Sequence, residues 1–146
     1  MSVTLGDMGF HSSPVGHRCM LLPMSSLARV INWPTLPTED LNPLLKRQFV
    51  SGAQGTIAHL QLKHGALVPT HSHPNEQFCT IITGSLRFIL DPDGAAEPVT
   101  LNAGDMLIIP GNLPHSAEAL EDTHCQDVFA PVRADWESGN DAYLRK

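Results

Sequence analysis

Basic residues, cysteines and long apolar runs are all scarce in this chain of 146 residues, and each shortage argues against a class of protein. Nine Lys and Arg stand against 15 Asp and Glu, which gives a net charge of −6 at pH 7. Binding to nucleic acid needs a basic surface to face the phosphates, so we expect no nucleic-acid partner.

The three cysteines, Cys19, Cys79 and Cys125, are widely spaced and form no Cys-x-x-Cys pair. An odd, scattered set argues against a disulfide framework and fits reduced thiols in a cytoplasmic protein. No apolar run approaches the ~20 residues of a membrane-spanning helix. The stretch before Leu27 has no Lys and its first Arg is Arg18, so it makes a poor signal peptide. We therefore predict a cytoplasmic protein with no membrane partner.

Proline and glycine are plentiful instead, with 12 and 11 residues, and such a chain favours short strands over long helices. The segment Thr56–Lys63 alternates, which places Ala58, Leu60 and Leu62 on one face of a strand. Further strands are predicted over Phe78–Thr83, Leu86–Leu90, Val99–Leu101, Met106–Ile109 and Cys125–Ala130, with a turn at Asp91–Pro98. Short strands separated by turns predict an all-β sandwich or barrel.

The length favours a single domain, able to bury roughly 70% of the surface that its unfolded chain exposes. Residues 1–31 show no convincing period, so we interpret them as an irregular N-terminal extension, or as an arm packed on a partner subunit, before a domain over 32–146. Three prolines make Asn32–Pro43 irregular or extended. A short helical turn around Thr38–Leu45 is compatible with Thr38 as its N-cap and with the acidic residues that follow.

The eight histidines are as many as the Phe, Trp and Tyr residues together, and two of them form a His-x-His pair. On a strand, His71 and His73 point to the same side, close enough to share one metal ion. Gln77 keeps this side if the backbone stays extended, although a turn at Pro74-Asn75 could break the register. A bare His-x-His is also compatible with two surface histidines near a turn. Five histidines are predicted to be solvated: His11, His17, His59, His64 and His124.

A second group of residues lies near the end of the chain. On the predicted strand, Cys125, Asp127 and Phe129 share a face. A carboxylate beside an aromatic ring would be costly in a dry core, so Asp127 faces either solvent or a wet functional cavity. Arg133 follows this strand and could close over the mouth of such a cavity. Cys79 has the parity of Gln77, so it faces the same cavity or is a small buried apolar residue.

Two segments resemble the motifs of the cupin family. The first motif runs Gly, five residues, His-x-His, three or four residues, Glu, six residues, Gly, and it is matched from Gly65 to Gly84 with Gln77 in place of Glu. In the second motif, the Gly, Pro and His positions are matched by Gly104, Pro110 and His115, whereas Asn112 and Ala119 replace its second Gly and its Asn. The resemblance implies an all-β fold, the cupin double-stranded β-helix or jelly-roll barrel.

The resemblance also implies one divalent metal ion, such as Zn, Ni, Mn or Fe, because imidazole nitrogen with an amide oxygen suits these ions. The implied ligands are His71, His73, Gln77 and His115. All four are neutral, so the charge of the ion stays uncompensated and favours a small anionic substrate.

A narrower resemblance concerns HSHPNEQ (71–77) and DVFAPVRADW (127–136), which are similar to segments of pectin-degradation cupins that convert 4,5-unsaturated uronates into linear keto sugars. It implies that Asp127, Phe129 and Arg133 act beside the metal. Arg133 would hold the uronate carboxylate with two parallel bonds, Asp127 would carry the proton, and Phe129 would form an apolar wall.

Other functions fit the same residues. A metal-dependent cupin dioxygenase or lyase is one alternative, and a cupin that binds a sugar or small anion without catalysis is another. Since cupins are commonly dimeric, the resemblance also implies a homodimer.

Overall fold

The computed structural model describes residues 28–90 and 97–146. Within them, Asn32–Lys146 forms one compact unit. The predicted extension over residues 1–31 and the predicted turn at Asp91–Pro98 fall largely outside the described residues. Both stay predictions.

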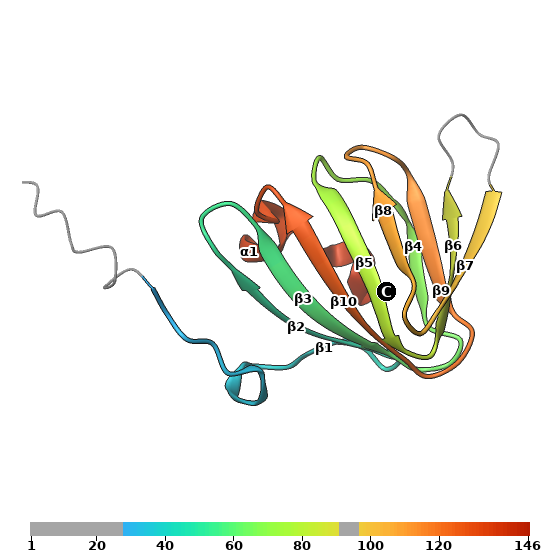
Figure 1. Cartoon of the computed structure of the whole chain (residues 1–146), viewed down its shortest axis with the longest axis horizontal. Coiled ribbons are helices and arrows are strands. Elements are labelled where there is room, and N and C mark those ends of the chain that lie inside the picture. The colour runs from blue at the N-terminus through green and yellow to red at the C-terminus, as the bar shows by residue number, and fades with distance from the viewer. Residues whose placement is uncertain (1–27, 91–96) are drawn as a thin grey trace, which may run out of the picture. The chain divides into compact units, whose positions relative to one another are not determined.

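Antiparallel strands build this unit as two sheets (Figure 1). The larger sheet has the order β1-β2-β3-β10-β5-β8 and the smaller one the order β4-β9-β6-β7. The strands are β1 Glu39–Asn42, β2 Leu45–Ser51, β3 Thr56–Leu62, β4 Leu67–His71, β5 Glu76–Thr83, β6 Ser85–Leu90, β7 Glu97–Asn102, β8 Met106–Ile109, β9 His115–Ala119 and β10 Thr123–Ala130. This architecture confirms the predicted all-β cupin jelly-roll barrel.

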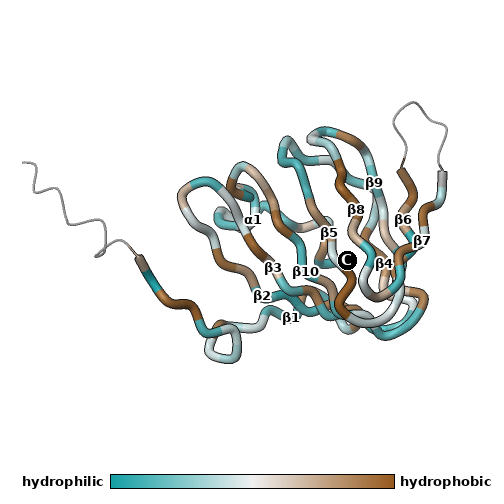
Figure 2. Tube along the Cα trace, viewed as in Figure 1, coloured by the Kyte–Doolittle hydropathy of each residue, from teal (hydrophilic) through white to brown (hydrophobic). Residues whose placement is uncertain are grey.

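Alternation along the strands explains how the barrel closes on a core. Ala58, Leu60 and Leu62 of β3 are buried, as the sequence predicts. On β10, every second residue from Thr123 to Phe129 is buried. Figure 2 shows hydrophobic segments on β3, β6 and β8. The inner faces of both sheets therefore bury mainly apolar side chains. The few polar residues buried among them are candidates for a functional site.

The helical turn suggested by the sequence around Thr38–Leu45 does not form. This segment forms the β1–β2 hairpin instead. Opposite charges meet across the two strands: Arg47 donates to Glu39 at 2.8 Å, and Lys46 lies 3.1 Å from Asp40. These cross-strand pairs, and packing on β3, outweigh the local helix signal. The helical turn of this region lies earlier, as η2 over Trp33–Thr35 with proline near its start.

Two strands that the sequence pattern did not reveal, β4 and β9, pair in the smaller sheet. β4 contains Pro69 and exposes Leu67, so it lacks a clean alternation. Their register sets His71 opposite His115. The missed pair is therefore the one that joins the two cupin motifs.

Positive φ angles explain one substitution and one match in these motifs. Asn112 has φ 64°, a left-handed conformation that glycine adopts freely and asparagine tolerates, so it can replace the second Gly. Gly84 has φ 88°, and a Cβ there would collide with the backbone of Asp122.

The chain ends in two short helical turns, α1 over Ala134–Glu137 and η3 over Ala142–Arg145. Asp141, at the start of η3, accepts a 2.6 Å hydrogen bond from the buried Arg47. Asn42 of β1 donates to the carbonyl of Leu144, whose side chain is buried. No helix among the described residues is long and apolar enough to cross a membrane.

Candidate metal centre

Three histidines converge inside the barrel from both motifs. His71 ends β4, His115 begins β9, and His73 lies in the bend after β4. The ring centroids of His71 and His115 are 4.4 Å apart, and those of His73 and His115 are 5.1 Å apart. One nitrogen of each ring lies within 4.8 Å of the other two, a spacing at which three ligands can reach one ion.

Backbone carbonyls fix the orientation of all three rings. Nδ1 of His71 lies 2.8 Å from the Pro69 oxygen, and Nδ1 of His115 lies 2.7 Å from the Leu113 oxygen. Nδ1 of His73 lies 3.0 Å from the oxygen of Asn75. A carbonyl only accepts, so each Nδ1 carries the hydrogen and each Nε2 keeps a free lone pair. This is the arrangement that holds metal-binding histidines in place.

Two further observations fit a cation at this point. Nε2 of His115 is buried and has no hydrogen-bond partner among the described residues. Burial lowers the pKa of His71 to about 4; the bond to Pro69 works against the shift, and the neighbouring His115, His73 and Arg133 add to it. Burial, Arg133 and His115 likewise lower the pKa of His73 to about 4. The rings are therefore neutral at pH 7 and available as ligands.

Gln77 supplies the fourth group. Its side chain is buried on β5, and its Oε1 lies 3.2 Å from Nε2 of His73. Both atoms accept hydrogen bonds when Nδ1 of His73 is protonated, so a shared cation between them would satisfy both. The four residues implied as ligands lie together. The fit is good, and it rests on neutral donors alone.

The route by which Gln77 reaches this point differs from the prediction. Residues 72–75 belong to no strand and bend at 74–75, where the chain passes from the smaller sheet to the larger one. Asn75 locks the bend, because its side chain donates to the carbonyls of Pro131 and Val132. The extended-strand argument therefore reached the right residue through the wrong backbone path.

A second cluster lies on the inner face of the larger sheet. Cys79, Cys125 and Asp127 are buried, and their Sγ and carboxylate atoms lie within 4.8 Å of one another. Asp127 therefore faces the interior rather than solvent. Its Oδ1 has no hydrogen-bond partner within the described parts of the chain.

The titration behaviour of this cluster is opposite to that of the histidines. Burial raises the pKa of Asp127 to about 6, although contacts with Cys79, Gln77 and Arg133 work against the shift. The bond with Cys125, burial and nearby Asp127 raise the pKa of Cys79 well above its usual value. The pKa of Cys125 is also raised: its bond with Cys79 works against the shift, but burial and Asp127 outweigh it. The thiols keep their protons and are poor metal ligands at neutral pH.

Both clusters border one cavity of about 50 Å³. Its polar lining consists of His71, Gln77, Cys79, His115, Cys125, Asp127, Arg133 and Tyr143. The apolar lining includes Phe129, whose ring meets that of His73 edge-on at 5.5 Å. Phe129 is thus a wall of the cavity, as the resemblance implies.

Arg133 also borders the cavity, yet its fork is already engaged. Nε and Nη2 donate to the two oxygens of Asp135 at 2.9 and 2.7 Å, and Nη2 also donates to the Tyr143 hydroxyl at 2.8 Å. The guanidinium lies 4.7 Å from the Phe129 ring centre and 4.3 Å from that of Trp136. The two parallel bonds predicted for a substrate carboxylate are made with Asp135 instead.

Sequence reasoning missed Tyr143, the single tyrosine of the chain. Its ring stacks on His71 at 4.5 Å and 25°. No motif signals this contact, because it depends on how η3 folds back over the barrel.

Two of the five histidines predicted to be solvated are only half-exposed and are engaged with neighbouring side chains. His59 of β3 and His124 of β10 share a 2.8 Å hydrogen bond, and Gln126 lies 3.1 Å from the other ring nitrogen of His59. The ring of Trp33 covers His59 at 4.2 Å. Neighbouring strands bring these side chains together on one face, which a single strand cannot reveal.

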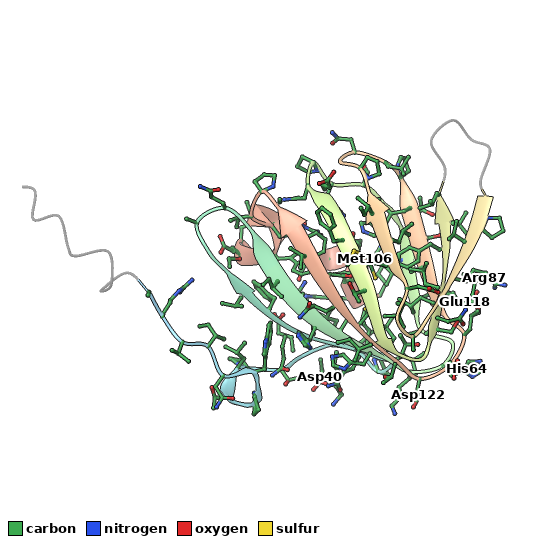
Figure 3. The ribbon with its side chains drawn as sticks, viewed as in Figure 1. Asp40, His64, Arg87, Met106, Glu118 and Asp122 are labelled. Atoms are coloured by element: carbon green, nitrogen blue, oxygen red, sulfur yellow. The ribbon has the colours of Figure 1, made fainter. Side chains whose placement is uncertain are left out.

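His64 is exposed, as predicted, and Figure 3 places it near the rim with Asp122. His11 and His17 lie outside the described residues.

Comparison with known proteins supports this reading of the barrel. Residues 58–129 match the family described as Cupin domain. Nitrosourea synthase from Streptomyces achromogenes is 35% identical over 69 residues, which are 47% of this chain and 14% of that protein. Oxalate decarboxylase OxdC from Bacillus subtilis is 35% identical over 65 residues, which are 44% of this chain and 17% of that protein. The chain thus spans less than a fifth of either relative.

Solved structures agree on the fold. KdgF from Halomonas is similar with a TM-score of 0.62 and 26% identity over 68% of this chain and 90% of that chain. A structure of oxalate decarboxylase, described for its Mn(II) centres, has a TM-score of 0.63 and 24% identity over 71% of this chain and 30% of that chain. Metal ions are thus bound by a relative with the same fold.

Proposed function

Because residues Asn32–Lys146 form a cupin barrel in which three histidines are placed to share one metal ion, we propose that this protein is an enzyme that converts a 4,5-unsaturated uronate to its linear keto form. One observation carries the proposal. The buried carboxylate of Asp127, with an unpaired oxygen and a pKa of about 6, borders the same cavity as His71, Gln77 and His115, three of the four candidate ligands. A proton carrier beside a metal centre is what enol-to-ketone conversion needs.

The candidate ligands are His71, His73, His115 and Oε1 of Gln77. A divalent ion held there would supply Lewis-acid chemistry, polarising substrate oxygens and stabilising negative charge that develops on them. Neutral ligands leave its charge uncompensated, which favours a substrate with a carboxylate.

Asp127 would move the proton. Its carboxylate accepts the proton of the hemiacetal hydroxyl while the bond between the anomeric carbon and the ring oxygen breaks, which leaves an aldehyde and an enolate on the former ring oxygen. The same proton is then delivered to the alkene carbon as the enolate becomes the ketone. A pKa of about 6 suits both steps, because the group gives up and takes a proton near neutral pH. The unpaired Oδ1 is the atom free to do so.

Phe129 and Arg133 would shape the site around the substrate. The Phe129 ring gives an apolar wall beside His73. Arg133 adds a buried positive charge, which attracts an anion although its fork is paired with Asp135.

A metal-dependent lyase that acts on a smaller acid is the second candidate. The cavity of about 50 Å³ favours it, because sites for drug-sized ligands usually begin near ~300 Å³. The sequence similarity of this chain to OxdC, which is named for oxalate, also favours a small acid as the substrate.

The test begins with metal analysis of protein purified without chelators. The metal-loaded protein is then incubated with 4,5-unsaturated galacturonate, and the loss of its ultraviolet absorbance is followed while dissolved oxygen is recorded. We expect turnover without oxygen uptake. Oxygen uptake coupled to substrate loss, or no turnover with any of Zn, Ni, Mn and Fe, would remove the proposal.

Asp127→Asn is the decisive variant. We expect turnover to fall by about 100- to 10,000-fold, the usual contribution of a proton-transfer group, while metal content stays unchanged. Asp122→Asn is the matched control, because Asp122 is exposed and does not line the cavity. This variant should keep full activity. Equal turnover of the two variants would exclude Asp127 from the reaction.

A further inference from the structure

The hydroxyl of Tyr143 has a donor to spare. Its oxygen accepts a 2.8 Å hydrogen bond from Nη2 of Arg133 and a longer one, 3.5 Å, from the indole of Trp136. Both of these groups can only donate, so the proton of the hydroxyl is not used by either. In the described residues it is donated to no protein group.

Tyr143 lies beside the candidate ligand site. Tyr143 borders the cavity together with His71, His115 and Asp127. Its ring stacks on His71, a candidate metal ligand, at 4.5 Å. Tyr143 is half-buried, so the acceptor of this proton is either a molecule in the cavity or solvent.

Anchors on both sides hold Tyr143 in this place. Asp141 pairs with Arg47 at 2.6 Å and with Arg145 at 3.0 Å. Leu144 is buried, and its carbonyl accepts from Asn42 at 3.1 Å. The η3 turn is thus fixed to β1 and β2, which makes the hydroxyl a preorganised donor.

Arg133 strengthens this donor without touching the ligand. Its fork is paired with Asp135, and one of the same nitrogens donates to Tyr143. A hydroxyl that accepts a bond from a cation becomes a better donor, because linked hydrogen bonds polarise one another.

We propose that Tyr143 donates a hydrogen bond from its hydroxyl to an anionic oxygen of the bound substrate, and that Arg133 acts through Tyr143 as a positioning residue. The inference rests on the proposed function for the identity of the substrate, an unsaturated uronate. It rests only on the geometry for the class of group recognised, a carboxylate beside the metal centre.

The test uses Tyr143→Phe, which removes the hydroxyl and keeps the ring on His71. Galacturonate and oxalate are titrated by calorimetry into the zinc-loaded wild type and variant. We expect the variant to bind these carboxylates about 10- to 100-fold more weakly, the loss typical of a hydrogen bond to a charged group. Its zinc affinity should stay unchanged, because the stacked ring remains.

Two controls separate the hydroxyl from the ring and the carboxylate from the sugar. Tyr143→Leu removes ring and hydroxyl together, so it should weaken zinc binding as well. Galactose, which lacks the carboxylate, should bind the wild type and Tyr143→Phe equally. With 4,5-unsaturated galacturonate, Tyr143→Phe should raise KM more than it lowers kcat.

If the protein binds carboxylates but does not turn over the unsaturated uronate, the proposed function fails. The role of Tyr143 is then still decided by the difference in carboxylate affinity between wild type and Tyr143→Phe. Equal affinity of wild type and Tyr143→Phe for both acids would overturn that role. So would failure of the zinc-loaded wild type to bind either acid.

Discussion

The histidine cluster and the sulfur–carboxylate cluster border one cavity, yet they differ in what they can hold. Each brings three ligand-type atoms within 4.8 Å of one another. The imidazoles of His71, His73 and His115 give their hydrogens to backbone carbonyls, so lone pairs face inward. The thiols of Cys79 and Cys125 keep their protons, because their pKa values are raised.

This difference teaches that proximity alone does not make a metal site. The hydrogen bonds behind each group decide whether it offers a lone pair or a proton. One cluster is suited to hold a cation, and the other, through Asp127, to hold a proton. Gln77 touches both, since it lies 3.2 Å from His73 and contacts Asp127.

The largest expected effect comes from His115→Ala. This change removes a buried lone pair that has no other partner in the described parts of the chain, so zinc affinity should fall by more than the ~10- to 100-fold that loss of an outer partner costs. Equilibrium dialysis against zinc measures it. Cys79→Ser is the matched control from the other cluster and should keep its zinc. Equal losses in both variants would erase the distinction.

A smaller effect is expected from Asp141→Asn, which loosens the turn that covers the histidine side. Arg47 is fully buried and would keep Glu39 as its one carboxylate partner within the described residues, so the free energy of unfolding should fall by about 3 kcal/mol. Urea denaturation measures it at pH 7. Asp40→Asn, which breaks an exposed pair on β1, is the control and should cost less than about 1 kcal/mol.

The same variant carries a pH dependence. Burial alone would raise the pKa of Asp141, but hydrogen bonds from Arg145 and Arg47 outweigh it and hold the pKa below its ordinary value. The pairing therefore contributes its full stability at pH values above the ordinary pKa of an aspartate. This contribution is lost as the pH falls through the lower pKa of Asp141 in the folded state. Wild type and Asp141→Asn should converge in stability only in strong acid. A constant difference down to pH 2 would contradict this assignment.

The smallest effect concerns thiol chemistry. In a Cys19→Ser background, Cys79 and Cys125 should react with iodoacetamide far more slowly than a free thiol at pH 8, because both are buried with raised pKa values. Mass spectrometry of the alkylated protein follows the reaction, with a urea-unfolded sample as reference. Alkylation at the unfolded rate would show reactive thiolates and bring the second cluster closer to the first.

The sequence predicted the parts of this molecule that depend on local pattern. Alternation revealed the inner face of β3, and motif spacing pointed to His71, His73, Gln77 and His115, which the fold brings together. The alternation of β10 also placed Asp127 on the same face as Phe129, which left open whether the carboxylate faces solvent or a cavity. Its burial in the structure shows that it faces the interior.

The parts that could not be predicted depend on contacts between distant segments. β4 lacks a clear alternation, and β9 is short with only alanine as its apolar residue, so both are recognised only through their pairing. The engagement of Arg133 by Asp135 and Tyr143 requires α1 and η3 to fold back. The bond between His59 and His124 requires β3 and β10 to be neighbours.

X-ray absorption spectroscopy of the zinc-loaded protein tests the contrast between the two clusters most directly, because it separates nitrogen and oxygen ligands from sulfur. We predict one zinc per chain, with imidazole scattering from His71, His73 and His115, and Zn–N or Zn–O distances near ~2.0–2.1 Å. Sulfur in the first coordination shell, at about 2.3 Å, would place zinc at Cys79 and Cys125 and contradict the account.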